Sequence, residues 1–162
     1  YKRQIFFGDP ITKGENKDAI NCVRMALEML DKLSELRKNW RKKGLALPLN
    51  ARIGIHTGIC TVGNFGSENR LDYTIIGNGV NLASRLESHA KPNSILVSED
   101  TYLHIQDEIL CNKHQKFKVK GVAYPVQTFC VDKLINKNVS NKHNIKKNFQ
   151  GFSLEMKFEN YQ

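Results

Sequence analysis

The chain has 162 residues, of which 40% are hydrophobic and 25% are charged, and its formal net charge is +9. This length and composition are those of a single soluble globular domain that buries a core of its own. No apolar run approaches the roughly 20 residues that a membrane-spanning helix needs, and no signal peptide is visible.

The first predicted elements are the end of a strand and a long helix. Residues 5–7 have the pattern of a buried strand, and the turn Gly8-Asp9-Pro10 closes it. Residues 15–43 have helical periodicity, with acidic residues at the start and basic residues before the stop at Gly44. The apolar stripe of this helix, which we expect to face the core, consists of Ile20, Val23, Leu27, Leu30, Leu33 and Trp40.

The next segment predicts a hairpin and a polar loop. Residues 52–56 alternate like a strand, and Thr57-Gly58 suggests a tight turn into a second strand at residues 59–63. Residues 64–70 have the composition of a Gly-containing loop that can lie over a ligand or a partner. A strand at residues 72–76 then leads through Gly77-Asn78-Gly79 into a helix from about Val80 to His89.

Short elements complete the predicted fold. We expect a buried strand at residues 95–97, a helix at residues 99–105 capped by Ser98, and a hairpin of residues 117–120 and 126–131. The run at residues 151–158 can add an edge strand. Mixed helices and antiparallel hairpins predict an α+β sandwich, with helices covering one sheet.

Charge and composition divide the chain in two. Much of the positive charge follows Asp132, so we assign residues 1–132 to the domain and residues 133–162 to a solvated Lys/Asn-rich tail. A nucleic-acid-binding tail is the alternative, but no RNA-binding motif and no interleaved aromatic and basic pattern supports it. The lysines concerned are Lys133, Lys137, Lys142, Lys146 and Lys147.

The four cysteines have no CxxC spacing: they are Cys22, Cys60, Cys111 and Cys130. Cys22 falls on the apolar side of the long helix, and Cys60 and Cys130 fall in strand patterns. We therefore predict buried free thiols rather than a zinc site. Free thiols fit a reducing compartment, so we expect a cytoplasmic protein or the cytosolic domain of a membrane-attached one.

Asn81 and Arg85 stand out in the second helix. They are four residues apart, so they project from the same face, close to the N–H groups and positive dipole end of the helix. Such a face suits an anion or a nucleotide. One alternative is an ordinary packed βα unit with Arg85 in solvent. Another is a dinucleotide fold, because Gly77-x-Gly79-x-x-Leu82 approximates GxGxxG, although Leu82 stands where that motif needs a small residue.

Three linked motifs resemble the catalytic domain of class III nucleotide cyclases, in the bacterial adenylate cyclase branch. They are HTG at residues 56–58, VGNFGSENRLDYTIIG at residues 62–77 and VNLASRLES at residues 80–88. The resemblance extends over about residues 5–131. It implies a ferredoxin-like α/β sandwich that converts ATP to cyclic AMP and pyrophosphate in intracellular signalling, in a head-to-tail homodimer or heterodimer.

The resemblance assigns roles residue by residue. Asn81 matches the residue that orients the ribose, and Arg85 matches the arginine that stabilises the α-phosphate in the transition state. Lys120 matches the lysine that reaches the terminal phosphates. Thr74 stands at a base-selecting position where many adenylate cyclases have Asp; its hydroxyl is compatible with adenine and leaves guanine open.

The family's metal ligands are the main departure. Two Asp residues hold two Mg²⁺ or Mn²⁺ ions in such cyclases, and both positions fall at or before Tyr1. Asp9 is a candidate substitute, but in this branch the FFGDP run is a separate turn after the metal motif. The chain also begins without Met, so we expect an N-terminally truncated domain that is inactive by itself, or a half-site that a partner completes. A catalytically inactive regulatory or dimerisation module and a guanylate cyclase are the alternatives.

Overall fold

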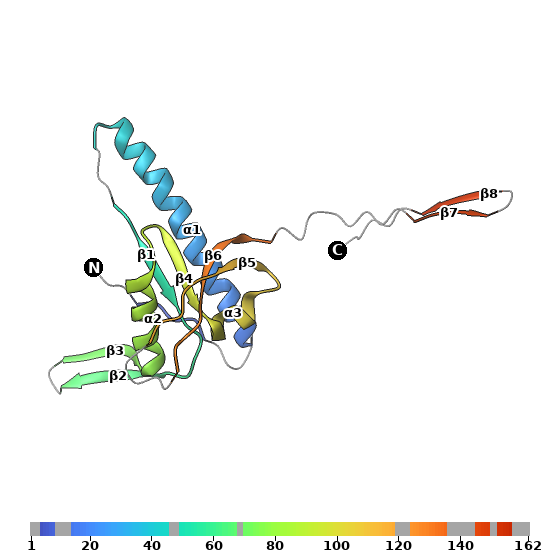
Figure 1. Cartoon of the computed structure of the whole chain (residues 1–162). Helices are drawn as coiled ribbons and strands as arrows, with labels where there is room; N and C mark the ends of the chain where they lie inside the picture. The colour runs from blue at the N-terminus through green and yellow to red at the C-terminus, as the bar shows by residue number, and fades with distance from the viewer. Residues whose placement is uncertain are drawn as a thin grey trace.

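The computed structural model describes residues 4–8, 14–45, 49–67, 70–118, 124–135, 145–149 and 152–156. Three helices are interspersed among eight strands in the described part of the chain (Figure 1). In order they are α1 (Glu15–Lys42), β1 (Arg52–Ile55), β2 (Thr61–Ser67), β3 (Arg70–Ile76), α2 (Asn78–His89), β4 (Ser94–Ser98), α3 (Glu99–Ile105), β5 (Ile109–Lys113), β6 (Thr128–Leu134), β7 (Ile145–Phe149) and β8 (Phe152–Met156).

Four strands form the central sheet, in the order β1-β4-β6-β5. β1 and β4 are parallel, with Gly54 opposite Leu96, whereas β6 runs antiparallel to both β4 and β5. A register shift between Leu110 and Cys111 interrupts the pairing of β5 with β6. β2 with β3, and β7 with β8, form two separate antiparallel pairs.

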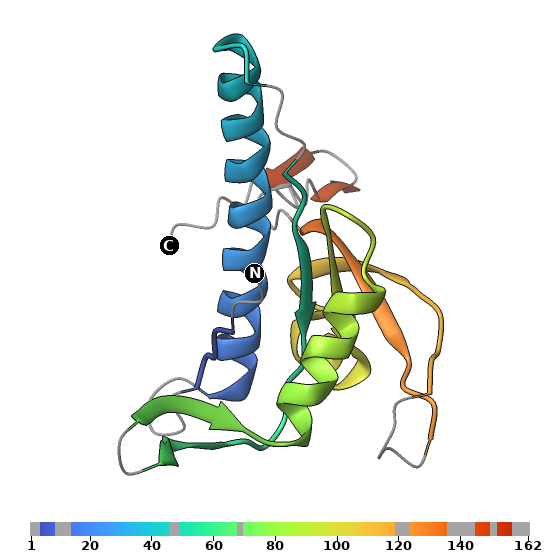
Figure 2. The same ribbon diagram turned by 90° about the vertical axis from the view of Figure 1, so that its left-hand side faces the viewer.

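Helices cover both faces of the central sheet (Figure 2). On one face, Val23 of α1 and Ile105 of α3 join Ile95 and Val97 of β4 in one buried cluster. On the other face, the α2 residues Leu82 and Leu86 meet Leu96. Successive residues of β4 therefore point into opposite cores, as the two-residue period of a strand requires. The predicted α+β sandwich is confirmed.

α1 follows the predicted pattern closely. Glu15 and Asp18 lie in its first turn and Arg41 and Lys42 in its last, where each charge complements the helix dipole. Gly44, with φ of +79°, follows the helix in the left-handed region that favours glycine. The buried stripe differs in detail: Ala19, Val23 and Ala26 are buried, and the larger predicted residues Ile20, Leu27 and Leu30 pack around them.

The predicted hairpin of residues 52–56 with 59–63 is wrong. β1 pairs with β4 instead, and the strand at residues 61–67 pairs with the strand at residues 70–76, Gly63 lying opposite Thr74. Residues 64–67, predicted as loop, therefore belong to β2, and Arg70 begins β3. The alternation of residues 52–56 did identify a strand, but its partner is distant in the sequence.

Several other predictions differ from the structure. Residues 5–7, predicted as a buried strand, form no strand, and Ile5, Phe6 and Phe7 are exposed. α2 begins at Asn78 rather than Val80. β5 was not predicted. Of the predicted hairpin of residues 117–120 with 126–131, the described residues show one bridge, between Phe117 and Val126, and β6 pairs with β4 and β5. Residues 152–156 do form a strand, as predicted, and it pairs with β7.

The four cysteines are free thiols, but each is half-buried rather than buried. Burial raises the pKa of Cys22 to about 11. Burial also raises the pKa of Cys111 to about 11, with Cys130 and Asp132 adding to the shift. Both thiols therefore stay protonated at neutral pH. Among the described helices, none has the length and apolarity to cross a membrane.

Candidate active site

β3 leads into α2 through a single residue. Gly77 has φ of +150° and ψ of 168°, a conformation that side-chain-bearing residues rarely adopt. The carbonyl of Gly77 accepts the first helical hydrogen bond, from Asn81 N at 3.4 Å. The tight junction explains why α2 begins two residues before the sequence prediction, and it fixes the start of the helix relative to the β2–β3 hairpin.

α2 is seated on the sheet by close backbone contact. A Cβ atom added to Gly54 of β1 would lie 2.2 Å from Glu87 N and 2.3 Å from Ala83 O. Only a residue without a side chain lets the helix approach this closely. Leu86, which is fully buried, anchors the same helix over β4. The position of α2 is therefore set by its contacts with both β1 and β4.

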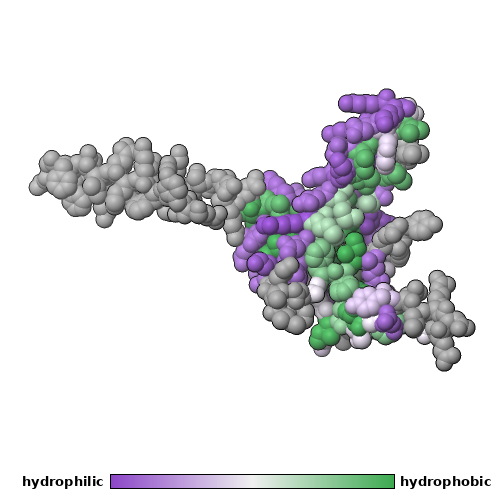
Figure 3. Space-filling model, turned by 180° about the vertical axis from the view of Figure 1, so that it is seen from behind, coloured by the Kyte–Doolittle hydropathy of each residue, from purple (hydrophilic) through white to green (hydrophobic). Residues whose placement is uncertain are grey.

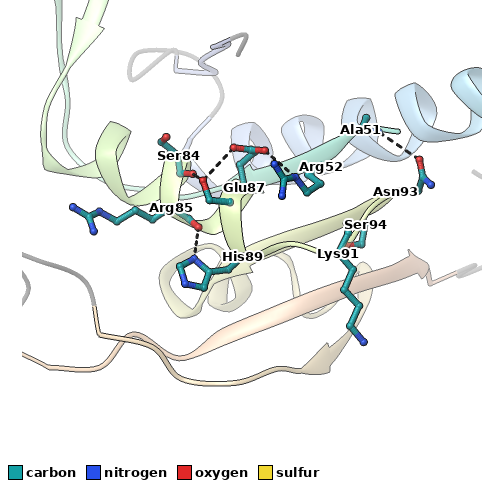
Figure 4. A network of polar contacts seen from close by, with 10 residues as sticks. Ala51, Arg52, Ser84, Arg85, Glu87, His89, Lys91, Asn93 and Ser94 are labelled. Atoms are coloured by element: carbon teal, nitrogen blue, oxygen red, sulfur yellow. Dashed lines mark hydrogen bonds and ion pairs between the residues drawn. The ribbon is translucent and has the colours of Figure 1, made fainter. Parts of the chain in front are cut away.

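The predicted site residues of α2 lie off this packed face. Asn81 is exposed and Arg85 is half-buried, one helical turn further on. Within the described part of the chain, the guanidinium of Arg85 makes no hydrogen bond or ion pair. Figure 4 shows it extending away from α2 and from the neighbouring Glu87. A donor fork held on a rigid helix and left without a protein partner can bind an anionic group.

On the opposite flank of α2, an ion pair neutralises the charge of an arginine. Arg52 Nε lies 3.2 Å from Glu87 Oε1, so this arginine is engaged with a carboxylate (Figure 4). The ion pair joins the start of β1 to the third turn of α2. The two arginines near α2 therefore differ: Arg52 helps to hold the helix, whereas Arg85 faces outward.

The exposed side of α2 that holds Asn81 and Arg85, which we call the Asn81–Arg85 ridge, ends in a stacked ring pair. His89, four residues after Arg85, stacks on Phe117 with ring centroids 4.2 Å apart and planes 3° from parallel. Its Nδ1 lies 2.8 Å from the carbonyl oxygen of Arg85. The stack therefore joins the end of α2 to Phe117. The sequence reasoning missed His89, although its spacing of four from Arg85 placed it on the same face.

Of the other predicted site residues, the structure describes only Thr74. Thr74 is half-buried in β3, three residues before the Gly77 junction with α2. Lys120 and Asp9 lie outside the described residues. The structure thus brings Asn81 and Arg85 onto one ridge and puts Thr74 in the strand that leads to it.

His56, which lies beneath α2, is another residue whose role the sequence did not predict. His56, directly after β1, places Nδ1 2.8 Å from Ser98 Oγ and 3.6 Å from Asp100 Oδ2. Burial lowers the pKa of His56, and the nearby Asp100 carboxylate partly offsets this shift. The histidine was visible in the HTG motif, but its contacts depend on α3, which lies more than forty residues later.

The described residues do not fit a metal centre. No group of three or more His, Cys, Asp or Glu side chains among them could hold an ion. Two described carboxylates are in ion pairs instead: Glu87 with Arg52 at 3.2 Å, and Glu108 with Arg24 at 2.8 Å.

Comparison with known proteins agrees with this geometry. The family model described as "Adenylate and Guanylate cyclase catalytic domain" matches residues 5–133. The chain belongs to this class III cyclase family. Adenylate cyclase 1 of Rhizobium meliloti is 34% identical over 111 residues, which are 67% of this chain and 16% of that protein. Guanylate cyclase beta of Plasmodium falciparum is 39% identical over 74 residues, which are 45% of this chain and 2% of that protein.

Solved cyclase structures share the fold. The adenylyl cyclase CyaB from P. aeruginosa is 50% identical with a TM-score of 0.74, over 78% of this chain and 65% of that one. The guanylyl cyclase Cya2 is 34% identical with a TM-score of 0.70, over 82% and 66%. This cyclase chain therefore spans about two thirds of the solved domains it resembles, and a small part of the curated relatives. The dinucleotide-fold alternative is wrong, because the match covers the whole Gly77–Leu82 segment.

Proposed function

We propose that this chain contributes the Asn81–Arg85 half of an adenylate cyclase active site, which converts ATP to cyclic AMP and pyrophosphate. The observation that carries the proposal is the outward-facing guanidinium of Arg85, which has no partner among the described residues, on a helix whose other flank is fixed to the sheet. Cyclisation joins the ribose 3′-oxygen to the α-phosphorus and releases pyrophosphate. A cationic donor fork beside that phosphorus stabilises the charge that develops in the transition state.

The residues of the ridge divide the work. Asn81, in the first turn of α2, offers an amide that can hold the ribose, and Arg85 meets the α-phosphate one turn later. Lys120 would bind the terminal phosphates, and the His89–Phe117 stack would hold its segment beside α2. Because the charge at the α-phosphate grows during the reaction, Arg85 should serve catalysis more than ATP binding.

ATP is the substrate that we favour. Thr74 can donate to or accept from the adenine edge through one hydroxyl. The 50% identity with the adenylyl cyclase CyaB supports the same choice. Guanylate cyclase is the second candidate, because Cya2 and the Plasmodium protein are guanylate cyclases by name, and Cya2 matches over 82% of this chain. A hydroxyl selects less sharply than a carboxylate, so substrate choice is decided by assay.

The proposal requires a partner subunit. Two Mg²⁺ or Mn²⁺ ions in cyclases of this family activate the 3′-hydroxyl and neutralise phosphate charge. The described residues provide no such ligand cluster. We therefore expect the metal ligands to come from sequence beyond the described residues or from a partner in a head-to-tail dimer. The cytoplasm, where ATP is abundant, is the expected location.

Complementation tests the function directly. The chain is mixed with a complete cyclase catalytic domain, such as that of CyaB, in which the arginine aligned with Arg85 is replaced by alanine. That domain keeps its metal ligands but cannot stabilise the transition state alone. With Mn²⁺, we expect cyclic AMP from ATP and little cyclic GMP from GTP.

Each other outcome has a defined meaning. A larger yield of cyclic GMP would make the chain a guanylate cyclase half-site. No product from a pair that is folded and associated, as shown by circular dichroism and sedimentation velocity, would favour an inactive cyclase-like regulatory module. The Arg41→Ala variant is the matched control, because Arg41 lies exposed on α1, a different element, and its loss should leave complementation unchanged.

A further inference from the structure

A buried polar network lies beneath the first turn of α2. Its centre is His56, whose side chain is only 11% exposed. Nδ1 of the ring forms a hydrogen bond with Ser98 Oγ at 2.8 Å. Ser98 is fully buried at the end of β4, so the bond connects the exit of β1 to the exit of β4. None of these residues belongs to the Asn81–Arg85 ridge.

The ring of His56 fills the space under α2. A Cβ atom added to Gly79, in the first turn of the helix, would lie 3.1 Å from Cδ2 of the ring. A Cβ atom added to Gly58 would lie 2.7 Å from Nε2. The ring is therefore held between two glycine backbones, one of which is part of α2. The ring thus lies close to Gly79, two residues before Asn81.

The partner of His56 is itself fixed. Ser98 Oγ caps α3 by accepting a hydrogen bond from Thr101 N at 3.3 Å. Thr101 Oγ1 lies 3.1 Å from Thr57 Oγ1 and 3.2 Å from Ser98 Oγ. Both Ser98 and Thr101 are fully buried. Since each of these residues has a hydrogen-bond partner, the network has one preferred geometry. His56 is the residue of the network that lies next to α2.

We propose that His56 is a positioning residue of the nucleotide site: held by Ser98, its ring supports the first turn of α2 and thereby sets the placement of Asn81 and Arg85. The effect on turnover rests on the function proposed above for these two residues. His56 itself does not touch the substrate. Catalytic geometry is sensitive to such support, since a displacement of about 1 Å can cost roughly 10²-fold in rate.

The network also makes this support sensitive to acid. Among the described residues, Asp100 of α3 is the charged side chain that faces the ring. The facing residues of α2 (Asn78–Asn81), the turn Thr57-Gly58 and Ser98 of β4 carry no charge. Burial lowers the pKa of His56 below its usual 6.5. Protonation would put a cation beside the positive dipole end of α2, and the repulsion would weaken the packing of the start of the helix.

The sign of the pH effect follows. The folded domain binds the His56 proton less readily than the unfolded chain does. Stability and correct seating are therefore complete above about pH 6.5 and decrease as the pH falls through the lower pKa of the folded state. Replacing His56 by Asn keeps a hydrogen-bonding atom near the position of Nδ1 but removes the titration.

Nuclear magnetic resonance of this chain tests the positioning without any assay of activity. The His56 ring and the amides of Gly79 and Asn81 are followed from pH 7.5 to 5. We expect the two amides to shift with the same midpoint as the ring, and these shifts to disappear in His56→Asn. His104→Gln is the matched control, because His104 bonds Asn16 between α1 and α3, away from α2. Amides that ignore the His56 titration would overturn the proposal.

Kinetics of the complemented pair provide the second readout. The ratio of His56→Asn to wild-type kcat cancels the titration of ATP itself. We expect this ratio to rise as the pH falls from 7.5 to 5, with KM for ATP changed less than about twofold, as expected for an effect on the transition state. A flat ratio in an active pair would overturn the positioning role while leaving the cyclase function intact. If the Gly79 and Asn81 amides follow the His56 titration but the complemented pair has no cyclase activity, only the proposed function would be overturned.

Discussion

The central strand β4 and the β2–β3 hairpin contain similar apolar residues in opposite surroundings. Ile95, Leu96 and Val97 of β4 are at most 1% exposed, because strands pair with both of its edges and helices cover both of its faces. In the hairpin, Tyr73 is 70% exposed and Ile76 is 46% exposed. Stability therefore resides in the sheet, whereas the hairpin keeps apolar surface available.

This surface favours association. Single exposed apolar residues are common in soluble proteins. The hairpin has several in a short segment, with Tyr73 and Ile76 on opposite faces of the strand pair. Ile59, which is 97% exposed, and Val62 lie on the same segment as the hairpin. Figure 3 shows that hydrophobic residues form a band between hydrophilic flanks on the face opposite to that of Figure 1. The partner subunit in the proposed function would need an apolar surface, and the hairpin next to α2 offers one.

The largest expected effect lies in the sheet-facing core. Leu86→Ala should lower the free energy of unfolding by about 2–5 kcal/mol, because Leu86 is fully buried and leaves a cavity between α2 and β4. Urea denaturation followed by circular dichroism measures this. Leu103→Ala is the control: Leu103 is also a helical leucine but is 60% exposed, so its loss should cost less than about 0.5 kcal/mol. Equal losses would show that α2 does not pack as described.

A slightly smaller effect is expected where α2 touches β1. Gly54→Ala should cost about 1–3 kcal/mol and displace α2, since the new methyl group would meet backbone atoms at 2.2 and 2.3 Å. Gly63→Ala in β2 is the control, because its Cβ would meet only the Phe65 ring at an ordinary 3.6 Å. Thermal unfolding of both variants compares them. A stable Gly54→Ala protein would contradict the close approach.

An effect on association rather than stability is expected in the hairpin. Ile76→Ser should weaken binding to the complementing cyclase domain by about tenfold, or roughly 1.4 kcal/mol, while unfolding changes little. Sedimentation velocity measures the affinity. Leu45→Ser, at the end of α1, is the control because Leu45 has a similar exposure of 52%. If Leu45→Ser weakens the pair as much as Ile76→Ser does, the hairpin is not the contact surface.

The smallest effect is expected at the ion pair of Arg52 with Glu87. The two side chains are 47% and 24% exposed, so solvent screens their attraction. Arg52→Ala should lower the free energy of unfolding by less than about 1 kcal/mol, and 1 M NaCl should reduce the difference further. A larger, salt-independent loss in urea denaturation would mean that the pair is structurally essential to the seat of α2.

Local signals in the sequence predicted the local structure. The acid-to-base gradient and Gly44 gave the limits of α1 within one residue at its end, and Ser98 caps α3 as predicted. The order of motifs identified the family, which the family model then confirmed. Each of these predictions depends on residues that are close together in the chain, where helical and capping rules apply directly.

Pairing between distant segments could not be predicted in the same way. The alternation of residues 52–56 is compatible with any neighbouring strand, and the true partner, β4, begins about forty residues later. The need for glycine at position 54 arises from α2, and the environment of His56 arises from α3. The roles of Asn81, Arg85, Thr74 and Lys120 remain predictions from the family resemblance, and the division at residue 132 remains a prediction from charge and composition.

Arg85 provides the most direct test of the account. In the complemented pair, Arg85→Ala should lower kcat by about 10²–10³-fold, as expected when one donor to a developing anion is removed, with a small change in KM for ATP. Arg41→Ala, measured beside it, should retain full activity. Undiminished cyclic AMP formation by a folded, associated Arg85→Ala chain would contradict the account, because the ridge of α2 would then take no part in the reaction.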